Sequence, residues 1–160
     1  MKYTLILITL SASAFAADFA LAIGNPSAAS VPWSEDPPGA PYQARKVKDA
    51  AFAVRAENCA DPAKARITGT AEGLVNGARQ SVALKLIAGS AAGAYLVSRE
   101  WPPQGVWIVN LSGVCAGAKA GALVPIGPTG YMRESSKFFA RPATEAEIEA
   151  SLKSLGGDHK

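Results

Sequence analysis

Histidine is almost missing from this chain of 160 residues, which contains one, His159, beside the C-terminus. A Ser-His-Asp or Cys-His active site needs a fixed imidazole, and a zinc site built on histidines needs more than one. Chain ends fray unless other contacts hold them, so we expect His159 to be unsuited to either task. The sequence therefore predicts no catalytic residue of these types, no metal site and no cofactor.

Charged residues are also few, at 18% of the chain, and the formal net charge is only +3. The densest basic run is Arg45-Lys46-Val47-Lys48, which is too short to form the electrostatic footprint of a nucleic-acid-binding protein. After the N-terminal segment, no apolar stretch reaches the length of about 20 residues that spans a bilayer. We expect neither a nucleic-acid partner nor an integral membrane segment after signal cleavage.

The N-terminal segment has the three parts of a secretory signal peptide. Lys2 is followed by the apolar run Leu5–Leu10, and the small residues that come next end in Ala14-Phe15-Ala16. A positive start, a short apolar core and an A-x-A end are typical of cleaved export signals. Residues 1–16 are therefore predicted to be a signal peptide, with a second acceptable cut after Ala22, and the protein is predicted to be periplasmic or secreted.

The two cysteines, Cys59 and Cys115, fit an exported protein. An oxidising compartment converts an isolated pair of thiols into a crosslink. The alternative is two reactive thiols, but the chain has no Cys-x-x-Cys motif and no histidine near either cysteine to activate a thiolate. The sequence predicts a disulfide between Cys59 and Cys115.

The segment after the signal peptide, residues 17–48, is predicted to be a linker or extended arm. It is rich in alanine, serine and glycine and contains the prolines Pro26, Pro32, Pro37, Pro38 and Pro41. Proline fixes φ and removes a backbone donor, so this stretch is not expected to supply a central strand or a long helix.

The folded body is predicted over residues 49–140 and starts with a strand near Ala51. The best-defined element is a β-hairpin, because Asn76-Gly77 lies between the alternating runs Arg66–Val75 and Ala78–Ile87. Asn-Gly favours a two-residue turn with positive φ at both positions. The resulting register pairs Ala71 with Val82, Glu72 with Ser81 and Ile67 with Leu86. One face of the hairpin is then apolar and the other polar.

A second pair of strands is predicted at Ala94–Glu100 and Val106–Leu111, joined through Pro102-Pro103-Gln104-Gly105. The later strand is apolar on both faces, which is typical of a central strand. Beyond it we expect a Gly/Ala-rich loop at Ala116–Ala122 and a short strand at Leu123–Ile126.

Residues 141–160 are predicted to form a C-terminal helix and tail. Thr144 and Glu147 have the spacing of a capping box, and Ile148, Leu152 and Leu155 recur at helical intervals. We expect this narrow apolar stripe to dock on the body. Recognition of a partner by the exposed helix is the alternative.

Few side chains have the pattern of a chemical site. Glu57, Asp61 and Glu72 are the best-placed acids for paired-carboxylate catalysis, yet acids facing outward from a sheet are normally solvated. The chain has no Ser-x-x-Lys, and its Gly-rich stretch 113–121 lacks the Gly-Lys-Ser/Thr end of a phosphate loop.

Three aromatic residues, Tyr95, Trp101 and Trp107, are expected to gather around the second pair of strands. Aromatic groups on a sheet can form a platform for a sugar or peptide, although they more often fill a core. Trp107 is assigned to the core. Trp101 and Tyr95 are the candidate partner-binding residues.

The stretch from Trp101 to Ser112, WPPQGVWIVNLS, resembles the proline-glycine turn and tryptophan strand of small immunoglobulin-like β-sandwiches that bacteria export as accessory domains. Some of those domains handle copper, but here the only methionine beyond the signal peptide is Met132 and the one histidine is terminal. Gly113, rather than the tyrosine of true immunoglobulin domains, stands two residues before the second cysteine.

The predicted fold is mainly β, an immunoglobulin-like antiparallel β-sandwich with one C-terminal amphipathic helix. The predicted function is non-enzymatic: an exported sandwich that binds or stabilises an envelope or extracellular protein or glycan. Two alternatives stay open, a carboxylate-dependent hydrolase and a subunit that docks to a complex through its C-terminal helix.

Overall fold

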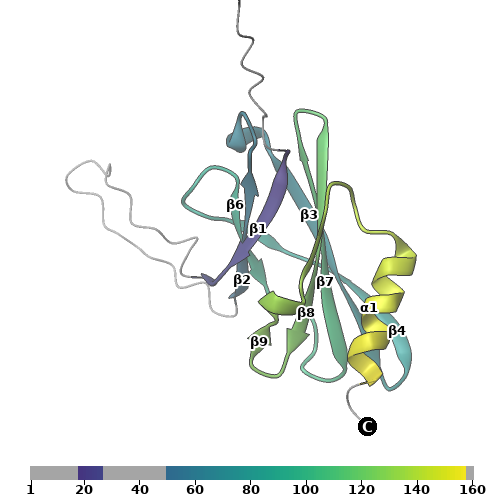
Figure 1. The fold of residues 1–160 in the computed structure, drawn as a ribbon. Helices are drawn as coiled ribbons and strands as arrows, with labels where there is room; N and C mark the ends of the chain where they lie inside the picture. The colour runs from purple at the N-terminus through teal and green to yellow at the C-terminus, as the bar shows by residue number, and fades with distance from the viewer. Residues whose placement is uncertain (1–17, 27–49, 158–160) are drawn as a thin grey trace, which may run out of the picture.

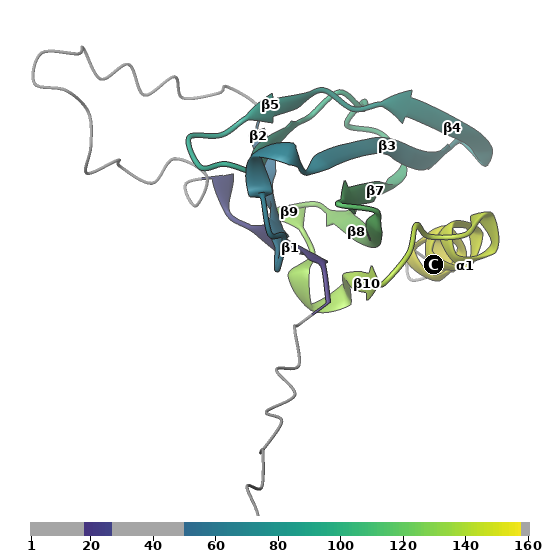
Figure 2. The same ribbon diagram turned by 90° about the horizontal axis from the view of Figure 1, so that it is seen from above.

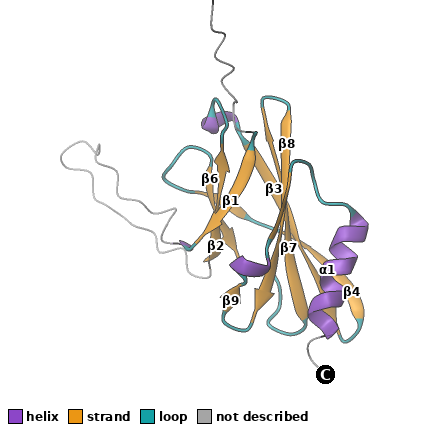
Figure 3. Ribbon diagram, viewed as in Figure 1, coloured by secondary structure: helices purple, strands orange, loops and turns teal. Residues whose placement is uncertain are grey.

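The computed structural model describes residues 18–26 and 50–157 of the chain (Figure 1). The predicted signal peptide, the basic run Arg45–Lys48 and His159 lie outside these residues. Strands dominate the body, and a single long helix follows them at the C-terminal end (Figure 3).

The strands form two antiparallel sheets. The four-stranded sheet has the order β1-β2-β6-β5, made of β1 (Ala20–Gly24), β2 (Ala50–Glu57), β6 (Ala94–Ser98) and β5 (Leu86–Ala88). The six-stranded sheet has the order β10-β8-β7-β3-β4, with β9 paired to β8; its strands are β3 (Arg66–Val75), β4 (Ala78–Ala83), β7 (Val106–Cys115), β8 (Ala118–Gly127), β9 (Gly130–Tyr131) and β10 (Lys137–Phe139). Two short 3-10 helices, Pro62–Lys64 and Arg133–Ser135, and the helix α1, Glu145–Gly157, complete the fold.

This strand order is that of an immunoglobulin-like sandwich. Immunoglobulin domains, with strands lettered along the chain, pair A-B-E-D in one sheet and C, F and G in the other. Here β1-β2-β6-β5 corresponds to A-B-E-D and β8-β7-β3 to G-F-C, while β4 extends the second sheet beyond β3. The predicted β-sandwich with one C-terminal helix is confirmed.

The main core lies between the two sheets. Phe52 and Val54 of β2 face Trp107, Val109 and Leu111 of β7, and all five side chains are buried. Trp107 lies directly over Gly73, where an added Cβ would come within 2.5 Å of the indole ring. A glycine is therefore required opposite this tryptophan in the register of β3 and β7. Trp107 is a core residue, as predicted.

The Asn-Gly hairpin has the predicted register only near its turn. Asn76 and Gly77 both have positive φ, and β3 pairs with β4 from Val75–Ala78 as far as Thr70–Ala83. The predicted pairing of Ile67 with Leu86 is wrong, because Leu86 pairs with Val97 in the other sheet. Alternation with a period of two shows which faces a strand has, but it does not show which sheet the strand joins.

The predicted second pair of strands does not form a hairpin. β6 pairs with β2 and β5 in the four-stranded sheet, whereas β7 pairs with β3 and β8 in the six-stranded sheet. The segment 99–105 therefore crosses between sheets. Its two prolines cannot donate backbone hydrogen bonds, and β7, apolar on both faces, takes a central position with a partner on each side.

The Gly/Ala-rich stretch predicted as a loop at Ala116–Ala122 mostly belongs to β8. Only Ala116 and Gly117 form the turn, both with positive φ. The small residues that follow mark close packing: Ala120 and Ala122 are fully buried, and an added Cβ on Gly121 would lie 2.4 Å from the carbonyl oxygen of Arg141. Gly121 thus lets the chain that leads to α1 pass directly over β8.

A strand also occurs within the range predicted as linker. Ala20–Gly24 forms β1, an edge strand on β2, and Phe19, Leu21 and Ile23 are buried in the core. Leu21 and Phe19 pack over Gly113 of β7. The prolines of the linker range begin only at Pro26, after this strand, so they do not prevent it.

The helix α1 docks on the outer face of the six-stranded sheet, on the far side of β7 and β8 from β1 and β2 (Figure 2). Ile148 and Leu152 pack on Ile108 of β7 and Leu123 of β8, and all four are buried. The predicted capping box is present: the Thr144 backbone N–H donates to the Glu147 carboxylate at 2.8 Å. The helix therefore uses its apolar stripe within the molecule, as expected.

Candidate functional site

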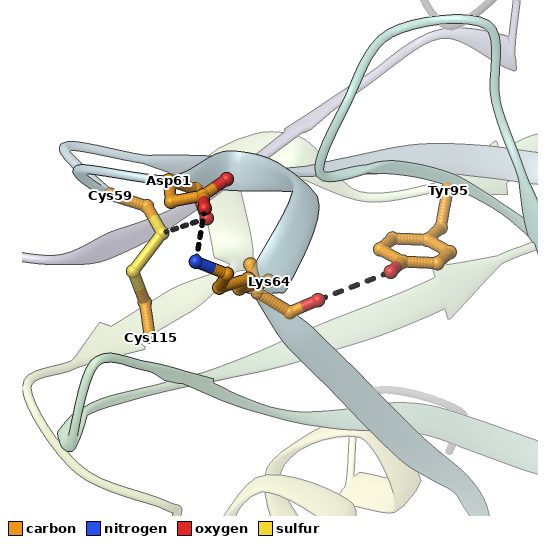
Figure 4. Close-up of a disulfide and its surroundings, with 6 residues drawn as sticks. Cys59, Asp61, Lys64, Tyr95 and Cys115 are labelled. Carbon is orange, nitrogen blue, oxygen red and sulfur yellow. Dashed lines mark hydrogen bonds and ion pairs between the residues drawn. A yellow bond between two sulfur atoms is a disulfide. The ribbon is translucent and has the colours of Figure 1, made fainter.

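One end of the sandwich is closed by the disulfide. Cys59, just after β2, is bonded to Cys115 at the end of β7, with a Cα–Cα distance of 5.9 Å (Figure 4). The bond joins the two sheets, and the loop beside it is fixed by an ion pair of 2.9 Å between Lys64 and Asp61. The hydroxyl of Tyr95 donates to the Ala65 carbonyl oxygen at 3.2 Å. The predicted disulfide is confirmed, and it indicates an oxidising, non-cytoplasmic compartment.

The three acids considered for hydrolysis do not meet in one cleft. Glu57 pairs with Arg55 on the four-stranded sheet, and Asp61 pairs with Lys64 in the loop beside the disulfide. Glu72 lies in β3 of the other sheet, on the face that α1 covers. The residues of the hydrolase hypothesis are thus distributed over the two sheets and the loop beside the disulfide.

Glu72 differs from the solvated acid that the sequence predicts, because only 7% of it is exposed. The carboxylate accepts hydrogen bonds from Ser81 Oγ at 2.7 Å and from Arg79 Nη2 at 3.0 Å, and Arg79 also pairs with Glu145 of the helix at 2.7 Å. Burial raises the pKa of Glu72, but hydrogen bonds from Thr70, Ser81 and Arg79 and the charge of Arg79 outweigh burial and hold the pKa below its ordinary value. A general acid needs a raised pKa, whereas the pKa of Glu72 is lowered. The side chains of Glu72, Arg79 and Glu145 instead fasten the helix to the sheet.

The candidate partner-binding aromatics are not on an open platform. Tyr95 is half-buried near the disulfide, whereas Trp101 is 4% exposed and lies in the segment between β6 and β7. The indole Nε1 of Trp101 is buried and donates to no acceptor in the described part of the chain. Trp107 Nε1, by contrast, donates to the Gln104 carbonyl oxygen at 2.7 Å. The structure brings Trp101 and Trp107 together but places Tyr95 elsewhere.

Trp101 and Trp107 line a cavity of about 600 Å³, which we call the end pocket. Segments from five places in the chain form it: the crossing between β6 and β7, the start of β7, the end of β8 with its turn, the residue after β9, and the last turn of α1. Its lining residues are Arg99, Trp101, Pro103, Gly105, Val106, Trp107, Ile126, Gly127, Pro128, Met132 and Leu155. Cavities between about 300 and 1,000 Å³, mostly apolar with a few polar groups, are typical of small-ligand sites.

Local backbone requirements shape this pocket. Gly105 has a φ of +91°, and an added Cβ there would lie 2.5 Å from the Leu74 carbonyl oxygen, so the crossing segment fits tightly against β3. Met132 is held because its N–H donates to the Pro125 carbonyl oxygen at 2.8 Å. Nevertheless 39% of Met132 remains exposed at the rim. The pocket thus has a wall of buried tryptophan and an accessible methionine at its rim.

The end pocket carries a single charged side chain, Arg99, which is exposed. No acidic residue is among its lining residues, although Glu100 is the next residue along the chain. The ion pairs within residues 18–26 and 50–157 include none made by Arg99. The guanidinium is therefore available to an anion at the pocket.

A serine–lysine pair lies nearby, under the helix. Ser151 of α1 is 5% exposed, and Lys137 Nζ of β10 donates to its Oγ at 3.2 Å. A local sequence motif cannot show this pair, because Lys137 and Ser151 are 14 residues apart and belong to different elements. A lysine that acts as a base must be desolvated so that it is neutral, and Lys137 is exposed. The pair ties β10 to α1.

Among residues 18–26 and 50–157, no three His, Cys, Asp or Glu side chains gather closely enough to hold a metal ion. The same stretches contain no helix of the length and apolar character needed to cross a membrane. The chain matches no protein-family model, no curated protein and no solved structure.

Proposed function

We propose that this chain is an exported, non-enzymatic binding protein that receives an apolar group of an envelope or extracellular partner in its end pocket. The observation that supports the proposal is the cavity of about 600 Å³ walled by Trp101 and Trp107. Aromatic side chains provide large contact areas at low entropic cost. Among the described residues the buried N–H of Trp101 finds no acceptor, and a buried donor without a partner costs about 1 to 3 kcal/mol.

Export to the periplasm or beyond the cell is part of the same proposal. The disulfide supports it, and so does the signal-like segment at residues 1–16. Cleavage after Ala22 would divide β1 and remove Phe19 and Leu21, which are buried. We therefore expect cleavage after Ala16. N-terminal sequencing of the exported protein should begin at Ala17, and a start at Ile23 would contradict this expectation.

An uncharged fluorescent dye that brightens in apolar surroundings, Nile red, tests the pocket itself. It should bind at one saturable site, and Met132→Arg should abolish the binding because a long charged chain then occupies the rim. Val114→Arg is the matched control, since Val114 is similarly exposed, at 42% against 39%, but lies at the disulfide end of β7. Equal binding by both variants, or no saturable binding by the wild type, would reject the end pocket as the site.

A second candidate, docking to a complex through α1, has less support. The stripe that such docking needs, Ile148 and Leu152, is already buried against the sheet.

A further inference from the structure

The polar side chains of the end pocket have one chemical character: they are donors. Arg99 provides the only charged side chain of the lining, and the other two side chains with a polar atom that donates are Trp101 and Trp107. The indole N–H of Trp107 is already bonded to Gln104. A sugar needs acceptors as well as donors for its hydroxyl groups. The lining contains no carboxylate, amide or hydroxyl side chain that could accept from them.

The charge of Arg99 is uncompensated at the pocket. The lining contains no acid, and the ion pairs within the described ranges leave Arg99 out. An apolar ligand without charge would leave this guanidinium in solvent and gain nothing from it. A ligand with a carboxylate would form a charge-assisted hydrogen bond, for which the forked guanidinium is suited.

We propose that the ligand of the end pocket is a small amphipathic anion, with an apolar chain or ring against Trp101, Trp107 and Met132 and a carboxylate at Arg99. This inference rests on the proposed function, because it names the class of ligand for the same pocket. Arg99 sets the sign of the charge that the pocket accepts, and the tryptophan wall accommodates the apolar body.

The test displaces Nile red with three probes of equal chain length: dodecanoate, dodecanol and dodecyltrimethylammonium, each below its micelle concentration. Dodecanoate should bind most tightly. Arg99→Gln should weaken dodecanoate about fivefold, the size expected for one solvent-accessible ion pair, and leave dodecanol unchanged. Arg66→Gln is the matched control, because it removes an exposed arginine of the six-stranded sheet at the disulfide end and should change neither ligand.

The outcomes separate this inference from the proposed function. If dodecanol or dodecyltrimethylammonium binds as tightly as dodecanoate, or if Arg99→Gln leaves dodecanoate binding unchanged, the anion inference is wrong while the apolar pocket stands. If Nile red itself shows no saturable binding, both proposals fail. Preferential, Arg99-dependent binding to phosphatidylglycerol vesicles over monomeric dodecanoate would also overturn the inference, since the partner would then be a membrane surface.

Discussion

Removing the disulfide should strongly destabilise the sandwich. Cys59 and Cys115 are separated by 56 residues in sequence and join the two sheets at one end. A crosslink across a loop of this length removes entropy from the unfolded chain that is worth about 4 kcal/mol at 25 °C. We expect this loss in the double variant Cys59→Ala/Cys115→Ala. Single variants would leave one free thiol that can form mixed disulfides, so they are less informative.

The loss converts into a large shift of the melting temperature. The described body is on the order of 120 residues, for which the entropy of unfolding near 60 °C is about 0.25 kcal/mol per kelvin. A loss of about 4 kcal/mol therefore lowers Tm by about 16 °C. Circular dichroism melts of the oxidised protein, the reduced protein and the double alanine variant measure the shift.

The reduced wild type is the control for packing, because it keeps both sulfur atoms, and both cysteines are buried. Thiol labelling should show that reduction is complete. Reduced protein and double variant should then melt within a few degrees of each other. A drop of less than about 5 °C on full reduction would refute the argument from loop closure, since about 1 kcal/mol would then be the whole effect.

Three further changes test the packing of the helix. Gly121→Ala should lower the free energy of unfolding, measured with denaturant, by about 1 to 3 kcal/mol, because its Cβ would lie 2.4 Å from the Arg141 carbonyl oxygen. Gly156→Ala is the control and should not lower it, because an added Cβ there meets open space. Leu152→Ala should lower the free energy of unfolding by about 2 to 5 kcal/mol in the same assay, because removing this buried side chain leaves a cavity between helix and sheet. Glu147→Gln should reduce the fall of Tm with decreasing pH in a pH series of melts. A hydrogen bond from Arg141, followed by one from the Thr144 backbone, lowers the pKa of Glu147 from 4.5 to about 2. The contribution of Glu147 to stability is therefore present above pH 4.5 and is lost as pH falls towards 2.

Elements with a local chemical cause were predictable from the sequence. Asn76-Gly77 favours positive φ at both turn positions, and the structure has it there. Thr144 and Glu147 cap the helix through groups only three residues apart. In both cases the interacting atoms are neighbours along the chain, so no knowledge of the distant partners is needed.

Elements that depend on distant partners were not predictable in the same way. After Ala83 the alternation simply continues, yet the chain leaves β3 and Leu86 pairs with Val97. The outward face of β3 reads as polar because of Glu72, but α1, far along the sequence, covers that face and Arg79 compensates the carboxylate. The alternation of apolar and polar residues along a strand does not show which distant elements the strand will contact.

The candidate site shows the same limit. Trp101 was a candidate because of its neighbours in sequence, whereas Ile126, Met132 and Leu155 line the same pocket from other elements. Each of these reads as an ordinary apolar residue when considered alone. The sequence did not indicate Arg99 as a binding residue either, because an exposed arginine can be assigned to anion binding only when it is known which acids lie near it.

The pocket and the disulfide occupy opposite ends of β7, and this separates stability from binding. Residues 107 to 115 at about 3.4 Å per residue span about 27 Å, so Trp107 and Cys115 share no contact. A ligand that binds only the folded state adds the same stabilisation to the oxidised and the reduced protein. Well below its lowered Tm, the reduced protein should therefore bind Nile red with unchanged affinity. Weakened binding under those conditions would show that the crosslink holds the shape of the pocket through the length of the strand, and the two ends would then have to be treated as one coupled unit.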